Sequence, residues 1–165
     1  MQEILADFIG DLPYFAKILA ILLVSMLPIV ELRGAIPIGA IVGVEPWLTV
    51  VLAIVGNLLP IPFILLFIKK IFAWMRKKSE KLNKVVDKME AKAEKNKEKV
   101  MRYAFWGLVL FVAVPLPGTG GWTGALVAAM IDMPPKRAFV CVLTGVLIAA
   151  VIVSFITYGT VALFF

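Results

Sequence analysis

Two long stretches of the chain carry no charge and are apolar enough to cross a membrane. They cover residues 46–68, which are 23 residues, and residues 138–165, which are 28. A membrane-crossing helix needs about 20 apolar residues, so we expect both stretches to be spans. Pro60 and Pro62 each remove a backbone N–H donor, and we expect them to kink the first span.

Two further apolar stretches are interrupted near their middle. Residues 18–30 and 34–44 flank the charged triplet at 31–33, and each is too short to cross a membrane alone. Residues 103–131 are long enough, but PLPGTGG at 115–121 forbids a regular helix at their centre. Each unit is therefore predicted to be a hairpin of two half-depth helices. The irregular turn of such a hairpin must be buried in protein or face a water-filled cavity.

The two halves of the chain share this pattern. Sliding the sequence by 89 residues superposes Pro28 on Pro117, Ala40 on Ala129, Pro46 on Pro135 and Gly56 on Gly145. Chance matching in Pro- and Gly-rich apolar sequence is the alternative explanation. Arg102 and Lys136-Arg137 flank the second broken unit, and basic residues favour the cytoplasmic side, so this unit is predicted to be re-entrant. A true repeat would make the first hairpin enter from outside, which is the inverted architecture typical of secondary transporters.

The charge of the chain is concentrated between the halves. Residues 69–102 hold 13 of the 17 Lys and Arg and 5 of the 11 Asp and Glu. Residues 76–102 contain no Gly or Pro, which predicts a helix. This helix would either lie on anionic lipid or form a short coiled coil in a dimer. We thus expect an all-α membrane protein with a first repeat at 1–68 (hairpin 14–45, span 46–68), a cytoplasmic helix at 69–103, and a second repeat at 104–165 (hairpin 104–133, span 138–160).

The composition narrows the class of protein. The chain is 62% apolar and 17% charged, against about 45–50% and 25% for soluble domains, so a water-facing surface could not be covered. Histidine is absent and Cys141 is the single cysteine, which removes most metalloenzymes, Ser-His and Cys-His hydrolases, and haem sites. We expect a multi-pass protein of the cell membrane with no enzymatic activity, cofactor or metal. The acidic N-terminus and the uncharged C-terminus are both expected outside, and the basic segment fits lipid headgroups better than nucleic acid.

Glu31 and Arg33 are the charges predicted to lie deepest in apolar surroundings. Intramembrane charges are costly and usually mark a substrate or ion pathway. One interpretation is that the two neutralise each other and pin the turn. In the other, one binds substrate and its neighbour supplies a counter-charge or a proton site. Desolvation favours a protonated carboxyl, which suits proton coupling, whereas the nearby guanidinium favours the ionised form.

The second arm of each hairpin begins at a helix N-terminus, predicted near Gly34 and near Gly121. Unpaired N–H groups and the positive end of the helix dipole make such a terminus suited to an anion. Thr119 and Thr123 could add hydroxyl donors, and Asn57 is expected to hydrogen-bond the backbone of one turn.

The two turns resemble the signature loops of the putative small multidrug export family. The segments are Glu31-Leu-Arg33-Gly-Ala-Ile-Pro37 and Pro115-Leu-Pro117-Gly-Thr-Gly-Gly-Trp122-Thr-Gly124, and the resemblance covers about residues 14–160. That family is similar in layout to the DedA/VTT membrane proteins, which have paired re-entrant hairpins and include lipid-carrier translocases and scramblases. DedA proteins carry arginines in the second hairpin, where this chain has none. The resemblance implies a substrate site made of Glu31, Arg33, Gly34, Pro37, Pro115, Pro117, Gly118, Thr119, Gly120, Trp122 and Gly124, to which Asn57 and Thr123 are possible additions from the residues themselves.

Three functions are compatible with these features. The leading one is a transporter, of the small multidrug-export type, that moves a small amphipathic or anionic-headed substrate, with proton coupling left open. The alternative is a flippase or scramblase for a polyprenyl-phosphate-like lipid carrier, and the third is an assembly factor without a substrate. Two spans and two half-depth hairpins offer little protein to bury the turns. We therefore expect a homodimer or higher oligomer in contact with membrane lipids.

Overall fold

The computed structural model describes residues 4, 9–10, 12–80, 83–88, 90–91, 104–116 and 118–164. Within these ranges the chain forms helices and turns and contains no strand, which confirms the all-α fold class. The helices are α2 (Tyr14–Ser25), α3 (Glu31–Ile41), α4 (Pro46–Leu58), α5 (Ile61–Lys78), α7 (Ala104–Ala113), α8 (Gly121–Met130) and α9 (Pro135–Phe164).

Two segments among the described residues are long and apolar enough to cross a membrane, as predicted. They are Pro46–Ile68 and Pro135–Gly159, and only 33% and 39% of the residues in their most apolar parts are buried. Large apolar side chains such as Phe63 and Phe155 are exposed on them, as expected for surfaces that face lipid. The kink is also confirmed, because α4 ends at Leu58 and α5 begins at Ile61 after a turn.

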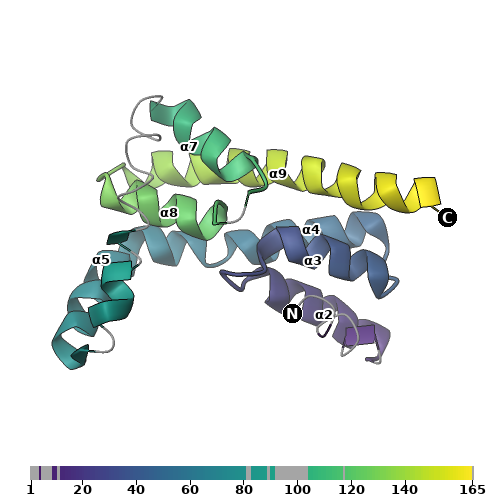
Figure 1. The fold of residues 1–165 in the computed structure, drawn as a ribbon, viewed down its shortest axis with the longest axis horizontal. Helices are drawn as coiled ribbons and strands as arrows, with labels where there is room; N and C mark the ends of the chain where they lie inside the picture. The colour runs from purple at the N-terminus through teal and green to yellow at the C-terminus, as the bar shows by residue number, and fades with distance from the viewer. Residues whose placement is uncertain are drawn as a thin grey trace.

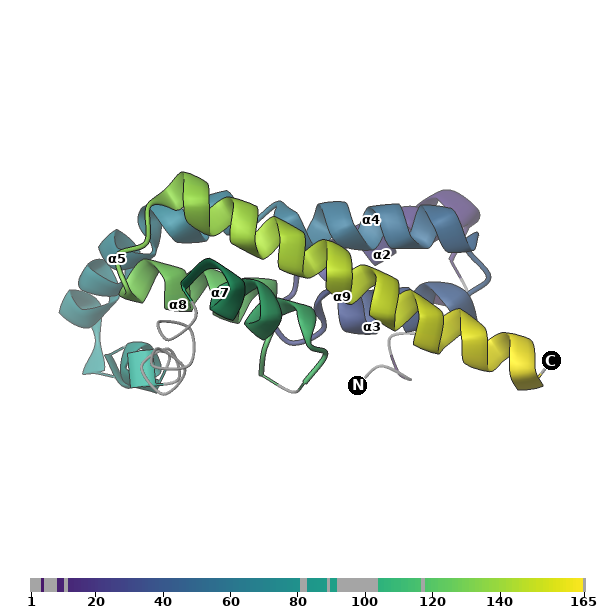
Figure 2. The ribbon, with the colours of Figure 1, turned by 90° about the horizontal axis from the view of Figure 1, so that it is seen from above.

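The two spans lie side by side and run in opposite directions. Pro46 at the start of α4 and Tyr158 near the end of α9 line one end of a shared groove, while Ile54 and Leu147 line the other. The helix pair α2–α3 packs against α4, and α7 and α8 both pack against the first half of α9, with α7 above it and α8 below it in the view of Figure 1. The turns of the two pairs point toward each other near the middle of the molecule (Figure 2).

The helix bounds recur along the chain. Moved by 89 residues, the bounds of α2 and α3 become 103–114 and 120–130, within one residue of α7 and α8. The start of α4 likewise falls on the start of α9. The chain therefore contains the same order of elements twice: two short helices, then a helix that begins with a proline and forms a long apolar span.

Glycines at equivalent positions let each long helix approach the first arm of its own pair. A Cβ at Gly56 of α4 would overlap Leu22 O and the Ser25 side chain of α2. A Cβ at Gly145 of α9 would lie 2.6 Å from Val112 Cβ and 2.9 Å from Val109 O of α7. Because backbone atoms are among the neighbours in both cases, any side chain would force the helices apart.

The break in the first hairpin lies earlier than the sequence indicated. The turn occupies residues 26–30, and Glu31 is already the first residue of α3, so the second arm does not begin near Gly34. Pro28 lies in the middle of this turn, where it donates no hydrogen bond that could continue α2. Glu31 and Arg33 consequently project from the first turn of a helix and not from a loop.

The basic segment is not one helix starting at Arg76. Helix α5 continues through the predicted boundary at residue 68 and ends at Lys78, and Ser79 is extended, with φ of −164° and ψ of 142°. Residues 83–88 are again helical. Arg76 binds Asp87 at 2.8 Å and Glu90 at 2.6 Å, which requires the chain to fold back after Ser79. Residues 92–103, the rest of the predicted helix, lie outside the described residues.

Candidate functional site

Arg33 joins the first hairpin to the end of α7. Its two terminal nitrogens donate five hydrogen bonds to oxygens of the second break. The acceptors are Val112 O at 3.0 Å, Val114 O at 3.2 Å, Leu116 O at 2.8 Å, Thr119 O, and Thr119 Oγ1 at 3.1 Å. The last carbonyls of a helix have no partner within it and lie at the negative end of its dipole. Arg33 therefore supplies the charge and part of the donors at this helix end, and the Thr119 hydroxyl also donates to Val114 O at 2.8 Å and Leu116 O at 2.9 Å.

Glu31 binds the other side of the same break. Its side chain is 5% exposed, and its Oε1 accepts a hydrogen bond of 3.2 Å from the backbone N–H of Trp122, the second residue of α8. Gly120, with φ of 142°, lies so close that a Cβ there would be 2.7 Å from the Glu31 carboxyl carbon. A carboxylate at a helix N-terminus is favoured by the free N–H groups and by the dipole.

The backbone at Glu31 is itself unusual. Its φ is 50°, a left-handed conformation that is uncommon for a residue with a side chain and costs on the order of 1–3 kcal/mol. Such strain concentrates at functional sites, where the surrounding structure maintains it. Here the conformation accompanies the contact between Glu31 and the start of α8.

The indole of Trp122 completes the connection between the two breaks. Its Nε1 donates a hydrogen bond of 3.0 Å to Met26 O in the first turn. Glu31 and Arg33 of the first helix pair thus bind the break between α7 and α8. In return, Trp122 of α8 binds the turn between α2 and α3. Glu31 and Arg33 also attract each other, but their hydrogen bonds to the other half show that mutual neutralisation does not fully describe them.

A pocket of about 470 Å³ opens between the two turns. Its polar lining comes from the two charges and two threonines, and its apolar lining from both turns. The lining residues are Pro28, Ile29, Val30, Glu31, Arg33, Pro115, Leu116, Gly118, Thr119 and Thr123. Six of these belong to the predicted set: Glu31, Arg33, Pro115, Gly118, Thr119 and Thr123.

The other predicted residues have different places. Gly120 and Trp122 contact Glu31 as described. Gly124 packs on α7, where a Cβ would overlap Val112. Gly34 is buried and Pro37 half-buried within α3. Pro117 lies outside the described residues.

Asn57 does not make the predicted hydrogen bond. It is fully buried, and its Oδ1 lies 2.5 Å from the position of a Cβ on Gly121, so it does reach the start of α8. Among the described residues, neither its Oδ1 nor its Nδ2 has a hydrogen-bond partner. The amide oxygen therefore faces the side of Gly121 on which a Cβ would stand.

Four lining residues were not foreseen as site residues: Pro28, Ile29, Val30 and Leu116. The only signal for them was proximity in sequence to the charged and proline-rich motifs. Leu116 lies between the two prolines of the second motif. Ile29 is an apolar residue that is 78% exposed, beside a proline turn.

These features define an all-helical membrane protein whose polar site lies between two helix breaks. A family model described as "putative small multi-drug export protein" matches residues 31–152, which is more than half of the chain. The chain belongs to this family, as the motifs of the two turns indicated. Among curated proteins and among solved structures, nothing matches.

Proposed function

We propose that this protein is a secondary exporter of small amphipathic solutes, and that the pocket between the two turns binds the polar part of the solute. The observation that carries the proposal is the pairing of Glu31 and Arg33 with opposite sides of the second break, beside a pocket of about 470 Å³. Membership of an export family supports transport out of the cell. Charges at membrane depth that hold irregular backbone are characteristic of transporter sites.

The proposed topology is an inverted repeat with re-entrant hairpins. The antiparallel long helices and the recurrence of helix bounds support it. Charge supports it as well: Lys136 at the start of α9 lines a hollow with Leu65 and Leu66 of α5, so the basic ends of both helices lie together. The positive-inside rule assigns this end to the cytoplasm.

Cysteine labelling will test the topology. On a Cys141→Ala background, we expect Ser79→Cys to react with a membrane-impermeant maleimide from the cytoplasmic side only. Pro13→Cys, on the exposed segment before α2, should react from the opposite side only. Labelling of both positions from one side would contradict the inverted arrangement.

Glu31 offers a means of coupling transport to protons. The ionised carboxylate forms a charge-assisted hydrogen bond with the start of α8, and such bonds contribute about 1.5–3 kcal/mol against about 0.5–1.5 kcal/mol for neutral ones. Proton uptake removes the charge and with it the attraction to the helix dipole. In the proposed cycle, protonation of Glu31 weakens the contact between α3 and α8, while Arg33 stays bound to the end of α7. The pocket then becomes accessible from the other side of the membrane.

The contacts of Arg33 bear on the substrate. Both terminal nitrogens bind carbonyl oxygens, and the start of α8 is occupied by Glu31. An anionic headgroup would therefore have to displace protein groups from both features that attract anions. Among the described residues, Arg33 Nε is buried without a partner, and it becomes available to a hydrogen-bond acceptor on the solute when the pocket changes its access. We therefore propose an amphipathic solute with such an acceptor and without a required negative charge, which disfavours the lipid-phosphate flippase.

Proteoliposomes will test this function. With a pH gradient imposed across phosphatidylcholine vesicles, we expect movement of rhodamine 6G, an amphipathic cation with an ester carbonyl as acceptor, and little movement of the anion 8-anilinonaphthalene sulfonate. Glu31→Gln should reduce the gradient-dependent rate at least tenfold. Glu45→Gln is the matched control, because Tyr14 donates a hydrogen bond to Glu45 outside the pocket and holds the pKa of that carboxyl below its ordinary value. Gradient dependence that survives in Glu31→Gln would contradict the coupling, and gradient-independent movement of a polyprenyl phosphate would support the flippase instead.

A further inference from the structure

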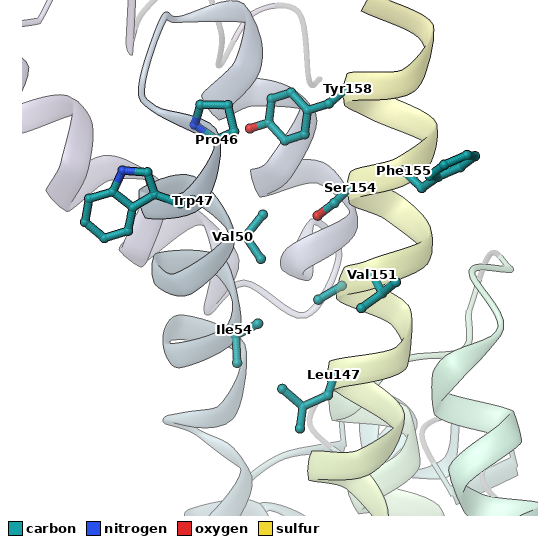
Figure 3. Close-up of a pocket in the computed structure, with 10 residues that line it drawn as sticks. Pro46, Trp47, Val50, Ile54, Leu147, Val151, Ser154, Phe155 and Tyr158 are labelled. Carbon is teal, nitrogen blue, oxygen red and sulfur yellow. The ribbon is translucent and has the colours of Figure 1, made fainter.

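A second and larger cavity lies on the outer side of the two long helices. It is a groove of about 700 Å³ between α4 and α9 (Figure 3). It shares no lining residue with the pocket at the turns, so a ligand could occupy this groove whether or not the protein exports a solute. Its lining is Pro46, Trp47, Val50, Ile54, Leu147, Ala150, Val151, Ser154, Phe155 and Tyr158.

One end of this groove contains two hydroxyl groups that lack partners. Within the part of the chain that the structure describes, Ser154 Oγ and Tyr158 OH are buried atoms without a hydrogen bond. Figure 3 shows both directed from α9 toward α4. Thr49 is the polar side chain near Tyr158, but the two hydroxyls do not meet the geometry of a hydrogen bond. The Thr49 hydroxyl donates to Val44 O at 3.4 Å and keeps its lone pairs.

Unpartnered hydroxyls are exceptional in a helix of this kind. A serine or threonine in an apolar helix normally donates to a carbonyl one turn earlier, as Thr144 of the same helix does to Val140 O at 2.8 Å. Buried polar atoms in folded proteins nearly always have a partner. Ser154 and Tyr158 are two such exceptions that lie close together and line one groove. We take this as an indication that a ligand in the groove accepts their hydrogen bonds.

The remainder of the groove is apolar and elongated. It extends along α4 from Pro46 to Ile54 and along α9 from Tyr158 to Leu147, which at about 1.5 Å per residue is roughly 12–16 Å. Beyond the two hydroxyls its walls are aliphatic, including Ile54, Leu147 and Val151. The shape and lining fit a single alkyl chain with a hydrogen-bond acceptor at one end.

We propose that the groove binds one acyl chain of a membrane phospholipid, whose ester carbonyl accepts hydrogen bonds from Ser154 and Tyr158. Ester carbonyls lie where the acyl chains meet the headgroups. Trp47 and Tyr158 mark this level at the polar end of the groove, because Trp and Tyr collect at membrane interfaces. The position of Pro46 at the start of the first span agrees with that depth.

The test uses native mass spectrometry of the full chain taken from bilayers with equal amounts of diester and diether phosphatidylcholine of the same chain length. The wild type should retain the diester lipid about two- to tenfold more, which is the effect of one neutral hydrogen bond. The double variant Ser154→Ala/Tyr158→Phe should lose the preference. Thr144→Val is the control, because it removes a hydroxyl that already has a partner in the same helix.

A groove-filling variant gives an independent readout. Val151→Trp should abolish lipid retention, and Ile156→Trp on the same helix should leave it unchanged. Both positions are exposed, at 70% and 55%, so neither substitution disturbs the core. Equal retention of diester and diether lipid by the wild type, or lipid retention by Val151→Trp, would overturn the proposal. If Val151→Trp instead dissociates a lipid-free dimer, a second copy of the chain covers the groove and the proposal is equally overturned.

Discussion

Arg33→Gln will lower the free energy of unfolding by about 3–5 kcal/mol, the range observed when one partner is removed from a buried charge network. The guanidinium makes five hydrogen bonds to the end of α7 and the following turn. Glutamine has one donor group and no charge, so the part-buried carbonyls of Val112 and Thr119 would compete for one donor, while Val114 O and Leu116 O keep the Thr119 hydroxyl. The Glu31 carboxylate would also lose a neighbouring positive charge. Thermal and denaturant unfolding in a mild detergent will measure the loss.

Two further variants make the result interpretable. Arg33→Lys keeps the charge but cannot reproduce the planar arrangement of donors, and it should fall between the wild type and Arg33→Gln. Arg137→Gln removes an exposed arginine at the start of α9 and should change stability by less than about 1 kcal/mol. If Arg33→Gln were as stable as Arg137→Gln, the side chain would not be holding the second break. Arg33 would then be free to bind an anion, and our view of the substrate would be wrong.

The sequence predicted those parts of the fold that depend on local composition. Both spans follow from the length of the apolar runs, and the kink follows from Pro60 and Pro62. The proline- and glycine-rich segment at 115–121 correctly separated α7 from α8. In each case the deciding interaction lies within one helix or turn, so neighbouring residues are sufficient to predict it.

The features that the sequence could not indicate depend on partners far along the chain. Arg33 binds residues 79 to 86 positions away, and Glu31 binds Trp122 91 positions away. Taken in isolation, Glu31 and Arg33 suggested a loop and left open whether they form a mutual pair or a substrate site, because nothing local shows that α7 ends and α8 begins where these charges can reach them. The reversal after Ser79 could not be predicted for the same reason, since Arg76 binds acids beyond the break.

Gly120→Ala should destabilise the protein about as strongly as Arg33→Gln, by roughly 3–5 kcal/mol, for two separable reasons. The backbone at Gly120 has φ of 142°, a conformation essentially restricted to glycine, and forcing a side chain into it costs about 1–3 kcal/mol. A Cβ would also overlap the Glu31 carboxylate and displace it from Trp122, with the loss of a charge-assisted bond of about 1.5–3 kcal/mol. Unfolding of the variant in detergent gives the sum of both effects.

A second substitution separates the clash from the backbone strain. Shortening the acid in Gly120→Ala/Glu31→Asp should recover part of the stability, because the carboxylate withdraws from the added methyl group while the strain at residue 120 remains. Gly159→Ala is the control: nothing lies within 4 Å of its added Cβ, and alanine in helix α9 should leave stability unchanged or raise it by up to about 1 kcal/mol. If the double variant were no more stable than Gly120→Ala, the cost would come from the backbone alone. The close contact between Glu31 and the start of α8, on which the proposed coupling rests, would then lack energetic support.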